Sequence, residues 1–122
     1  MHCRSSYNAL FERSGSNAAI TETSLLLFID SRMEITGTMA IEGDIGSVAL
    51  PLSRIIDRAT AARARQILLV HTHPSGDARP SLQDITVTRR LCAQLRGRNM
   101  RLMDHIILTT RRYFSFRMNR ML

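Results

Sequence analysis

The strongest constraint on the fold lies in residues 66–84, QILLVHTHPSGDARPSLQD, where an apolar run meets a loop and then a segment with helical spacing. The run QILLVHTH (66–73) is short and nearly continuous in apolar residues, which is typical of a strand buried on both faces. Proline and glycine in PSGDARP (74–80) indicate a loop after that strand. Residues 81–99 then carry an apolar stripe typical of an amphipathic helix. This order favours an α/β or α+β fold, in which helices pack on a sheet.

The remaining sequence predicts four more strands and a second helix. The strands are expected at 23–30, 34–43, 101–110 and 112–117, and the helix at 50–65. We therefore expect a mixed β-sheet flanked by helices. A chain of 122 residues, 44% of them hydrophobic, can close one core but is short for two domains. The expected organisation is an N-terminal arm, residues 1–20, that is partly ordered at most, followed by one domain, residues 21–122.

Composition narrows the environment and the partners. The longest apolar run, residues 25–29, is far below the roughly 20 residues of a membrane-spanning helix, and the N-terminus has no apolar signal region, so we expect a cytoplasmic protein without membrane contact. Cys3 and Cys92 lack metal or redox spacing and are expected to be free thiols, with Cys92 on an apolar stripe.

Charge and sheet edges leave the partners open. The net charge is +7, and the 17 basic residues are all arginines scattered along the chain. They form either a solvated surface or a contact surface for DNA or another acidic partner. Exposed sheet edges would also suit a homodimer.

Two histidines stand at the end of the expected strand 66–73. Successive side chains of a strand point to opposite faces, so His71 and His73 project from the same side, about 7 Å apart at their bases. Both imidazoles can then reach one metal ion. Either ring can instead be a hydrogen-bonded histidine at a strand end.

Asp84 has two interpretations. The loop can bring the first turn of the helix back to the end of the strand, so that Asp84 joins the histidines in an open zinc site of the catalytic type. SLQD (81–84) also has the spacing of a capping box, in which Ser81 caps the helix and Asp84 reaches back to the backbone amide of Ser81. Both interpretations predict a helix that begins at Ser81, but they differ in where the Asp84 side chain points.

The arrangement H-x-H, ten residues, Asp, with P-S-x-x-D inside it, resembles the metal motif of the JAB/MPN (JAMM) metalloprotease superfamily. HTHPSGDARPSLQDITVTRRL (71–91) is more narrowly similar to the RadC family's HNHPSG followed by PS..D...T..L, and LLLFIDS, RLMDHIIL and YFSF stand in the same order around it. The resemblance covers residues 20–118. Thr72 replaces the family's usual asparagine, at a position that should point away from the two histidines.

The resemblance implies a single JAB/MPN-type domain with cytidine-deaminase-like layering and a Zn²⁺ ion held by His71, His73 and Asp84. It also implies that Glu22, at the start of the first core strand, is the catalytic base that deprotonates a water. Ser81, if its hydroxyl faces the cavity, could donate a hydrogen bond to the oxyanion. The reaction would be hydrolysis of a peptide or isopeptide bond in an unknown protein or peptide substrate.

Several alternatives remain at this point. Without the resemblance, Glu22 is an exposed carboxylate at a strand edge, and Glu34 and Glu42 compete with it as the base. Of the adjacent Asp104 and His105, we expect one to be a buried hydrogen-bonding group and neither to be a ligand. The DNA-repair label of the RadC family, together with the charge of +7, also permits a nucleic-acid-binding or scaffold module without hydrolytic activity.

Overall fold

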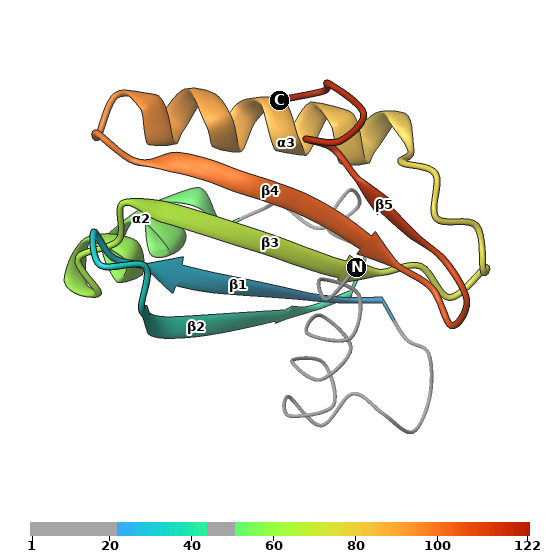
Figure 1. The fold of residues 1–122 in the computed structure, drawn as a ribbon, viewed down its shortest axis with the longest axis horizontal. Helices are drawn as coiled ribbons and strands as arrows, with labels where there is room; N and C mark the ends of the chain where they lie inside the picture. Colours follow the sequence, from blue (N-terminus) through green and yellow to red (C-terminus); the bar gives the residue numbers. More distant parts are fainter. Residues whose placement is uncertain (1–21, 44–50) are drawn as a thin grey trace.

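The computed structural model describes residues 22–43 and 51–122, and the expected N-terminal arm, residues 1–20, lies outside them. The expected mixed sheet with helices is confirmed (Figure 1). Within this described part, no helix has the length and apolar character needed to cross a membrane. The elements are β1 (Thr23–Ile29), β2 (Ile35–Glu42), α2 (Leu52–Ala61), β3 (Gln66–Thr72), α3 (Leu82–Arg96), β4 (Arg101–Leu108) and β5 (Tyr113–Ser115).

The sheet has the strand order β2-β1-β3-β4-β5, with β1 and β3 side by side. β1 runs antiparallel to both β2 and β3, whereas β3 and β4 are parallel and are connected through α3. The register between β1 and β3 places Ser24 opposite His71. The start of β1 therefore lies beside the end of β3, where the two histidines stand.

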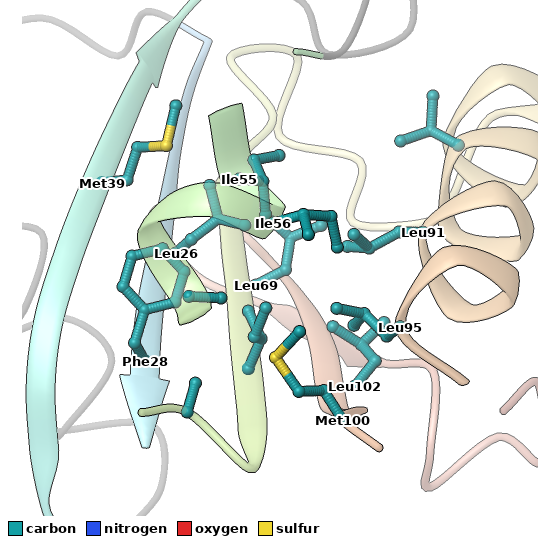
Figure 2. Packing of buried hydrophobic residues seen from close by; sticks show 14 residues of the cluster. Leu26, Phe28, Met39, Ile55, Ile56, Leu69, Leu91, Leu95, Met100 and Leu102 are labelled. Carbon is teal, nitrogen blue, oxygen red and sulfur yellow. The ribbon is translucent and has the colours of Figure 1, made fainter. Parts of the chain in front are cut away.

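The main core lies between one face of the sheet and both helices (Figure 2). Leu26, Phe28 and Leu69 from the sheet pack with Ile55 of α2 and Leu91 of α3. The alternate residues of the strands form a second buried cluster: Leu25, Leu27, Ile29, Leu68, Val70, Ile106 and Leu108. Both faces of the central strands are thus buried, which is why their sequences are continuous apolar runs.

Helix α2 ends about one turn earlier than the predicted range 50–65. The chain leaves the helix through Arg63, whose φ of 55° lies in the left-handed region. The Arg63 amide donates to the Thr60 carbonyl at 3.0 Å, and the Ala64 amide donates to the Ala59 carbonyl at 2.9 Å. This pair of bonds is the Schellman ending, which glycine usually provides. With arginine in that position, the sequence carries no stop signal.

Candidate metal centre

His71 and His73 lie on the same side of the sheet, as their spacing predicts. The ring centroids are 4.6 Å apart and the rings are close to perpendicular. His73 follows the last residue of β3, but its amide still donates to the Leu108 carbonyl of β4 at 2.9 Å, which continues the strand pairing. The His71 side chain is fully buried, and that of His73 is 12% exposed. Two imidazoles therefore meet at the edge of the core.

Glu22 stands beside them because β1 begins where β3 ends. The Thr72 hydroxyl oxygen accepts a hydrogen bond from the Thr23 amide at 3.0 Å, which ties the start of β1 to the end of β3. Glu22, His71 and His73 each offer one ligand atom, and these atoms all lie within 4.8 Å of one another. Such a group can hold a metal ion.

The competing glutamates, Glu34 and Glu42, are not part of this group. The amide of Glu34 donates to Asp30 in the turn at the far end of β1. The Glu42 side chain is exposed on β2. Of these three glutamates, Glu22 is therefore the one that the fold brings to the histidines.

The Asp84 carboxylate forms the predicted capping box and also lies against the two histidines. Its Oδ2 accepts a hydrogen bond from the Ser81 amide at 2.8 Å, and the Asp84 amide donates to the Ser81 hydroxyl at 3.0 Å, which completes a capping box. The same Oδ2 lies 3.1 Å from Nε2 of His73, and Oδ1 lies 3.6 Å from Nε2 of His71. One buried carboxylate thus starts α3 and faces both imidazoles.

The contact between His73 and Asp84 shifts the pKa values of both side chains. The hydrogen bond to Asp84 raises the pKa of His73 above its ordinary 6.5, although burial opposes this. Burial acts to raise the pKa of Asp84, but the hydrogen bonds from His73 and from the Ser81 amide outweigh it, and the pKa falls well below its usual range. Without a metal, the geometry therefore favours a protonated His73 beside an ionised Asp84.

Hydrogen bonds on the far side of each ring set its orientation. Nδ1 of His73 lies 2.8 Å from the carbonyl oxygen of Asp77, which can only accept, so this nitrogen carries a proton. Nδ1 of His71 lies 2.8 Å from Nε2 of His105 on β4. Burial, followed by the nearby His71, lowers the pKa of His105 well below its ordinary value, which keeps that ring neutral. Both candidate ligands present Nε2 to Asp84.

Asp104 and His105 were expected to include one buried hydrogen-bonding group, and both residues are of this kind. The side chains of both residues are buried, because both faces of β4 are covered. Asp104 accepts hydrogen bonds from the His105 amide and from the Ser115 hydroxyl, and it is not a member of the group formed by Glu22 and the two histidines. His105 contacts the ring of His71, a link that sequence spacing did not reveal. Thr88, which contacts His105 in turn, stands at the T of the RadC-like motif PS..D...T.

A cavity of about 650 Å³ opens beside His73. Its wall includes Ser81, whose hydroxyl is the predicted hydrogen-bond donor to the oxyanion. The Ser81 oxygen accepts from the Asp84 amide, and a hydroxyl group that accepts still has a proton to donate. The lining residues are Glu22, His73, Pro74, Ser75, Asp77, Arg79, Pro80, Ser81, Gln83 and Asp84.

Comparison with known sequences identifies the family. The UPF0758 protein YfjY of Escherichia coli (strain K12) is 31% identical over 96 residues, which are 78% of this chain and 60% of that protein. A UPF0758 protein of Chloroflexus aggregans is 34% identical over 93 residues, which are 76% of this chain and 40% of that protein. The matched region thus spans between 40% and 60% of the length of these two relatives. Residues 2–121 match the sequence model of the family described as RadC-like JAB domain. The chain belongs to the RadC-like JAB domain family.

Proposed function

We propose that this domain is a zinc-dependent hydrolase of the JAMM type that cleaves peptide or isopeptide bonds. The observation that carries the proposal is the convergence of Glu22, His71 and His73 within 4.8 Å, with Asp84 in contact with both imidazoles. Two imidazole nitrogens and one carboxylate make a typical ligand set of a catalytic zinc site, which uses three protein side chains and keeps one position open.

The residues present fit a zinc ion. His71, His73 and Asp84 would hold it, and Glu22 would remain beside the open position. The backbone carbonyl that accepts from Nδ1 of His73 is a typical second partner of a metal-binding histidine, because it fixes the ring and its tautomer. A zinc ion and the proton now shared by His73 and Asp84 would compete for the same Nε2 lone pair.

When bound, zinc supplies Lewis acidity, which makes a neighbouring water more acidic and polarises a substrate carbonyl. Glu22 would accept the proton of that water and return it to the leaving amine. The Ser81 hydroxyl would donate a hydrogen bond to the carbonyl oxygen as it gains negative charge. The cavity of about 650 Å³ offers room for the residues on either side of the cleaved bond.

Metal content is the first test. Protein purified without added metal should contain one zinc per chain by inductively coupled plasma mass spectrometry, and His71→Ala should contain none. Asp77→Asn removes an exposed carboxylate of the neighbouring loop that is paired with Arg79, so it serves as the control and should keep the zinc. A wild-type chain that takes up no zinc during dialysis against it contradicts the proposal.

Activity is the second test, with a library of peptides and of lysine-linked isopeptides as the substrate and mass spectrometry as the readout. Glu22→Gln should keep the zinc but lose about 10²- to 10⁴-fold in rate, because the general base is gone. Glu34→Gln and Glu42→Gln make the same change at the two competing positions and should leave the rate unaltered. If Glu22→Gln loses the zinc instead, Glu22 is a ligand and not the base. A zinc-loaded chain that cleaves no bond favours a binding or scaffold module.

A further inference from the structure

We propose that Thr88 and His105 are positioning residues, which fix the proton of His71 on Nδ1 and so keep its Nε2 ready to bind a metal. The proposal rests on the proposed metal site but concerns groups outside it. The carrying observation is a continuous line of buried contacts that begins at the backbone carbonyl of Asp84 on α3, crosses β4 and ends at His71 on β3.

The number of protons on each group determines which atom donates and which accepts in each of these hydrogen bonds. The Thr88 hydroxyl oxygen lies 2.7 Å from the carbonyl oxygen of Asp84, and two oxygens this close repel each other unless a proton lies between them. The carbonyl has none, so the single hydroxyl proton of Thr88 is used there. The same hydroxyl oxygen lies 2.7 Å from Nδ1 of His105 and must accept from it. The proton of a neutral His105 ring is therefore on Nδ1.

The next contact follows by the same count. Nε2 of His105 then has a lone pair, and it lies 2.8 Å from Nδ1 of His71. Nδ1 of His71 must donate the proton of this bond. A neutral His71 ring then has its lone pair on Nε2, the nitrogen that lies 3.6 Å from Asp84. The backbone carbonyl of Asp84 thus determines the tautomer of His71 through two intermediate side chains.

The packing holds this line in place. Thr88 and His105 are 1% and 0% exposed, so water does not compete for their hydrogen bonds. The ring of Phe116 stacks on the ring of His105, with centroids 4.4 Å apart and an angle of 5° between the planes. A ring held in this way cannot rotate without losing its contacts to both neighbours. The arrangement ties two candidate ligands, His71 on β3 and Asp84 on α3, into one hydrogen-bonded unit.

The direct test uses the zinc-free protein with ¹⁵N-labelled histidine and long-range ¹H–¹⁵N correlation spectra at mildly alkaline pH. The wild-type spectrum should show the His71 proton on Nδ1, and a wild-type proton on Nε2 would overturn the proposal. Thr88→Val removes the acceptor for Nδ1 of His105. The His105 proton should then move to Nε2 and donate to His71, whose own proton should appear on Nε2.

Zinc affinity, measured by competition with a chromophoric chelator, gives a second readout. Thr88→Val should bind zinc roughly 10- to 100-fold more weakly, because the His71 proton would then stand on Nε2; this is the usual range for a change outside the ligands themselves. Thr88→Ser keeps the hydroxyl and should restore both the tautomer and the affinity. Thr86→Val is the matched control, because the Thr86 hydroxyl makes the same bond to the carbonyl four residues earlier, Leu82, but is exposed.

The outcomes separate this proposal from the proposed function. If Thr88→Val has the wild-type tautomer, or loses no more zinc affinity than Thr86→Val, the positioning role is wrong even when the wild-type protein binds zinc. If the wild-type protein binds no zinc, the proposed function fails, and the tautomer in the zinc-free spectra still decides whether Thr88 and His105 orient His71.

Discussion

Replacement of Asp84 by asparagine tests whether the contact between His73 and Asp84 stabilises the zinc-free protein. The asparagine side-chain oxygen can still accept from the Ser81 amide, so the start of α3 is retained. The negative charge beside Nε2 of His73 is lost, however, and with it the charge-assisted hydrogen bond of 3.1 Å. Because Asp84 is 1% exposed and the His73 side chain 12%, solvent screens this contact little.

The size of the effect follows from the type of bond and the length of the chain. A hydrogen bond to a charged group contributes about 1.5 to 3 kcal/mol to the free energy of unfolding. Unfolding entropy of about 2.1 cal/mol/K per residue gives about 0.26 kcal/mol/K for 122 residues. Asp84→Asn should therefore lower the Tm of the zinc-free protein by about 6 to 12 °C where both groups are charged.

The pKa shifts of His73 and Asp84 define the pH range in which both groups are charged. The raised pKa of His73 means that its contribution is fully present below about pH 6.5 and is lost as the pH rises through the folded pKa. The lowered pKa of Asp84 means that its contribution is present above about pH 4 and is lost as the pH falls through the folded pKa. The difference between the wild type and Asp84→Asn should thus be largest between about pH 4 and 6.5 and should shrink at alkaline pH.

Differential scanning calorimetry of chelator-treated protein at about pH 5.5 and about pH 8.5 measures both differences. Asp77→Asn is the control, since the pKa of Asp77 is lowered to about 2 by Arg79 but its side chain lies at the surface, where an ion pair stabilises little. A loss for Asp84→Asn of the same size at both pH values, or of less than about 2 °C at the lower one, would refute the reasoning.

Three further outcomes are expected. Leu91→Ala empties a fully buried position between α3 and the sheet and should lower the free energy of unfolding by about 2 to 5 kcal/mol in urea titrations; a loss below about 1 kcal/mol would contradict the packing. Burial raises the pKa of Cys92, so in a Cys3→Ser background its thiol should react with iodoacetamide more slowly than free cysteine does, and an equal rate would show that it is accessible. Thr72→Val removes the acceptor of a hydrogen bond from the Thr23 amide. The loss of about 1 kcal/mol should accelerate hydrogen exchange at this amide about fivefold. Unchanged exchange would show that the bond contributes nothing to stability.

The strands and helices were predicted best where burial leaves a simple pattern of apolar residues in the sequence. The strands around residues 23–29 and 66–72 are continuous apolar runs because both faces of these strands are covered, and their predicted bounds agree with the structure within about one residue. The end of α2 was misjudged because Arg63 takes the left-handed conformation that sequence reasoning assigns to glycine. Local sequence patterns thus predicted the strands and helices, whereas the left-handed conformation of Arg63 is visible only in the structure.

The candidate site was likewise predicted from local sequence patterns only in part. The same-side placement of His71 and His73 followed from strand alternation, and the capping box followed from SLQD. Glu22 was found only through the family resemblance, since its approach depends on the antiparallel register between β1 and β3. The contacts of Thr88 and His105 join the consecutive elements β3, α3 and β4 through residues 17 and 34 positions apart, a separation that helix or strand periodicity does not reach.

The hydrogen bond from Nδ1 of His73 to the main-chain carbonyl of Asp77 limits what a substitution at position 77 can disturb. A main-chain acceptor exists whichever amino acid occupies position 77, so the orientation of the ring places no demand on that side chain. The loop 74–80 contributes much of the cavity wall, yet the candidate ligands at its two ends are held by β3 and α3. A substitution at position 77 can therefore change the cavity wall without disturbing the orientation of the His73 ring.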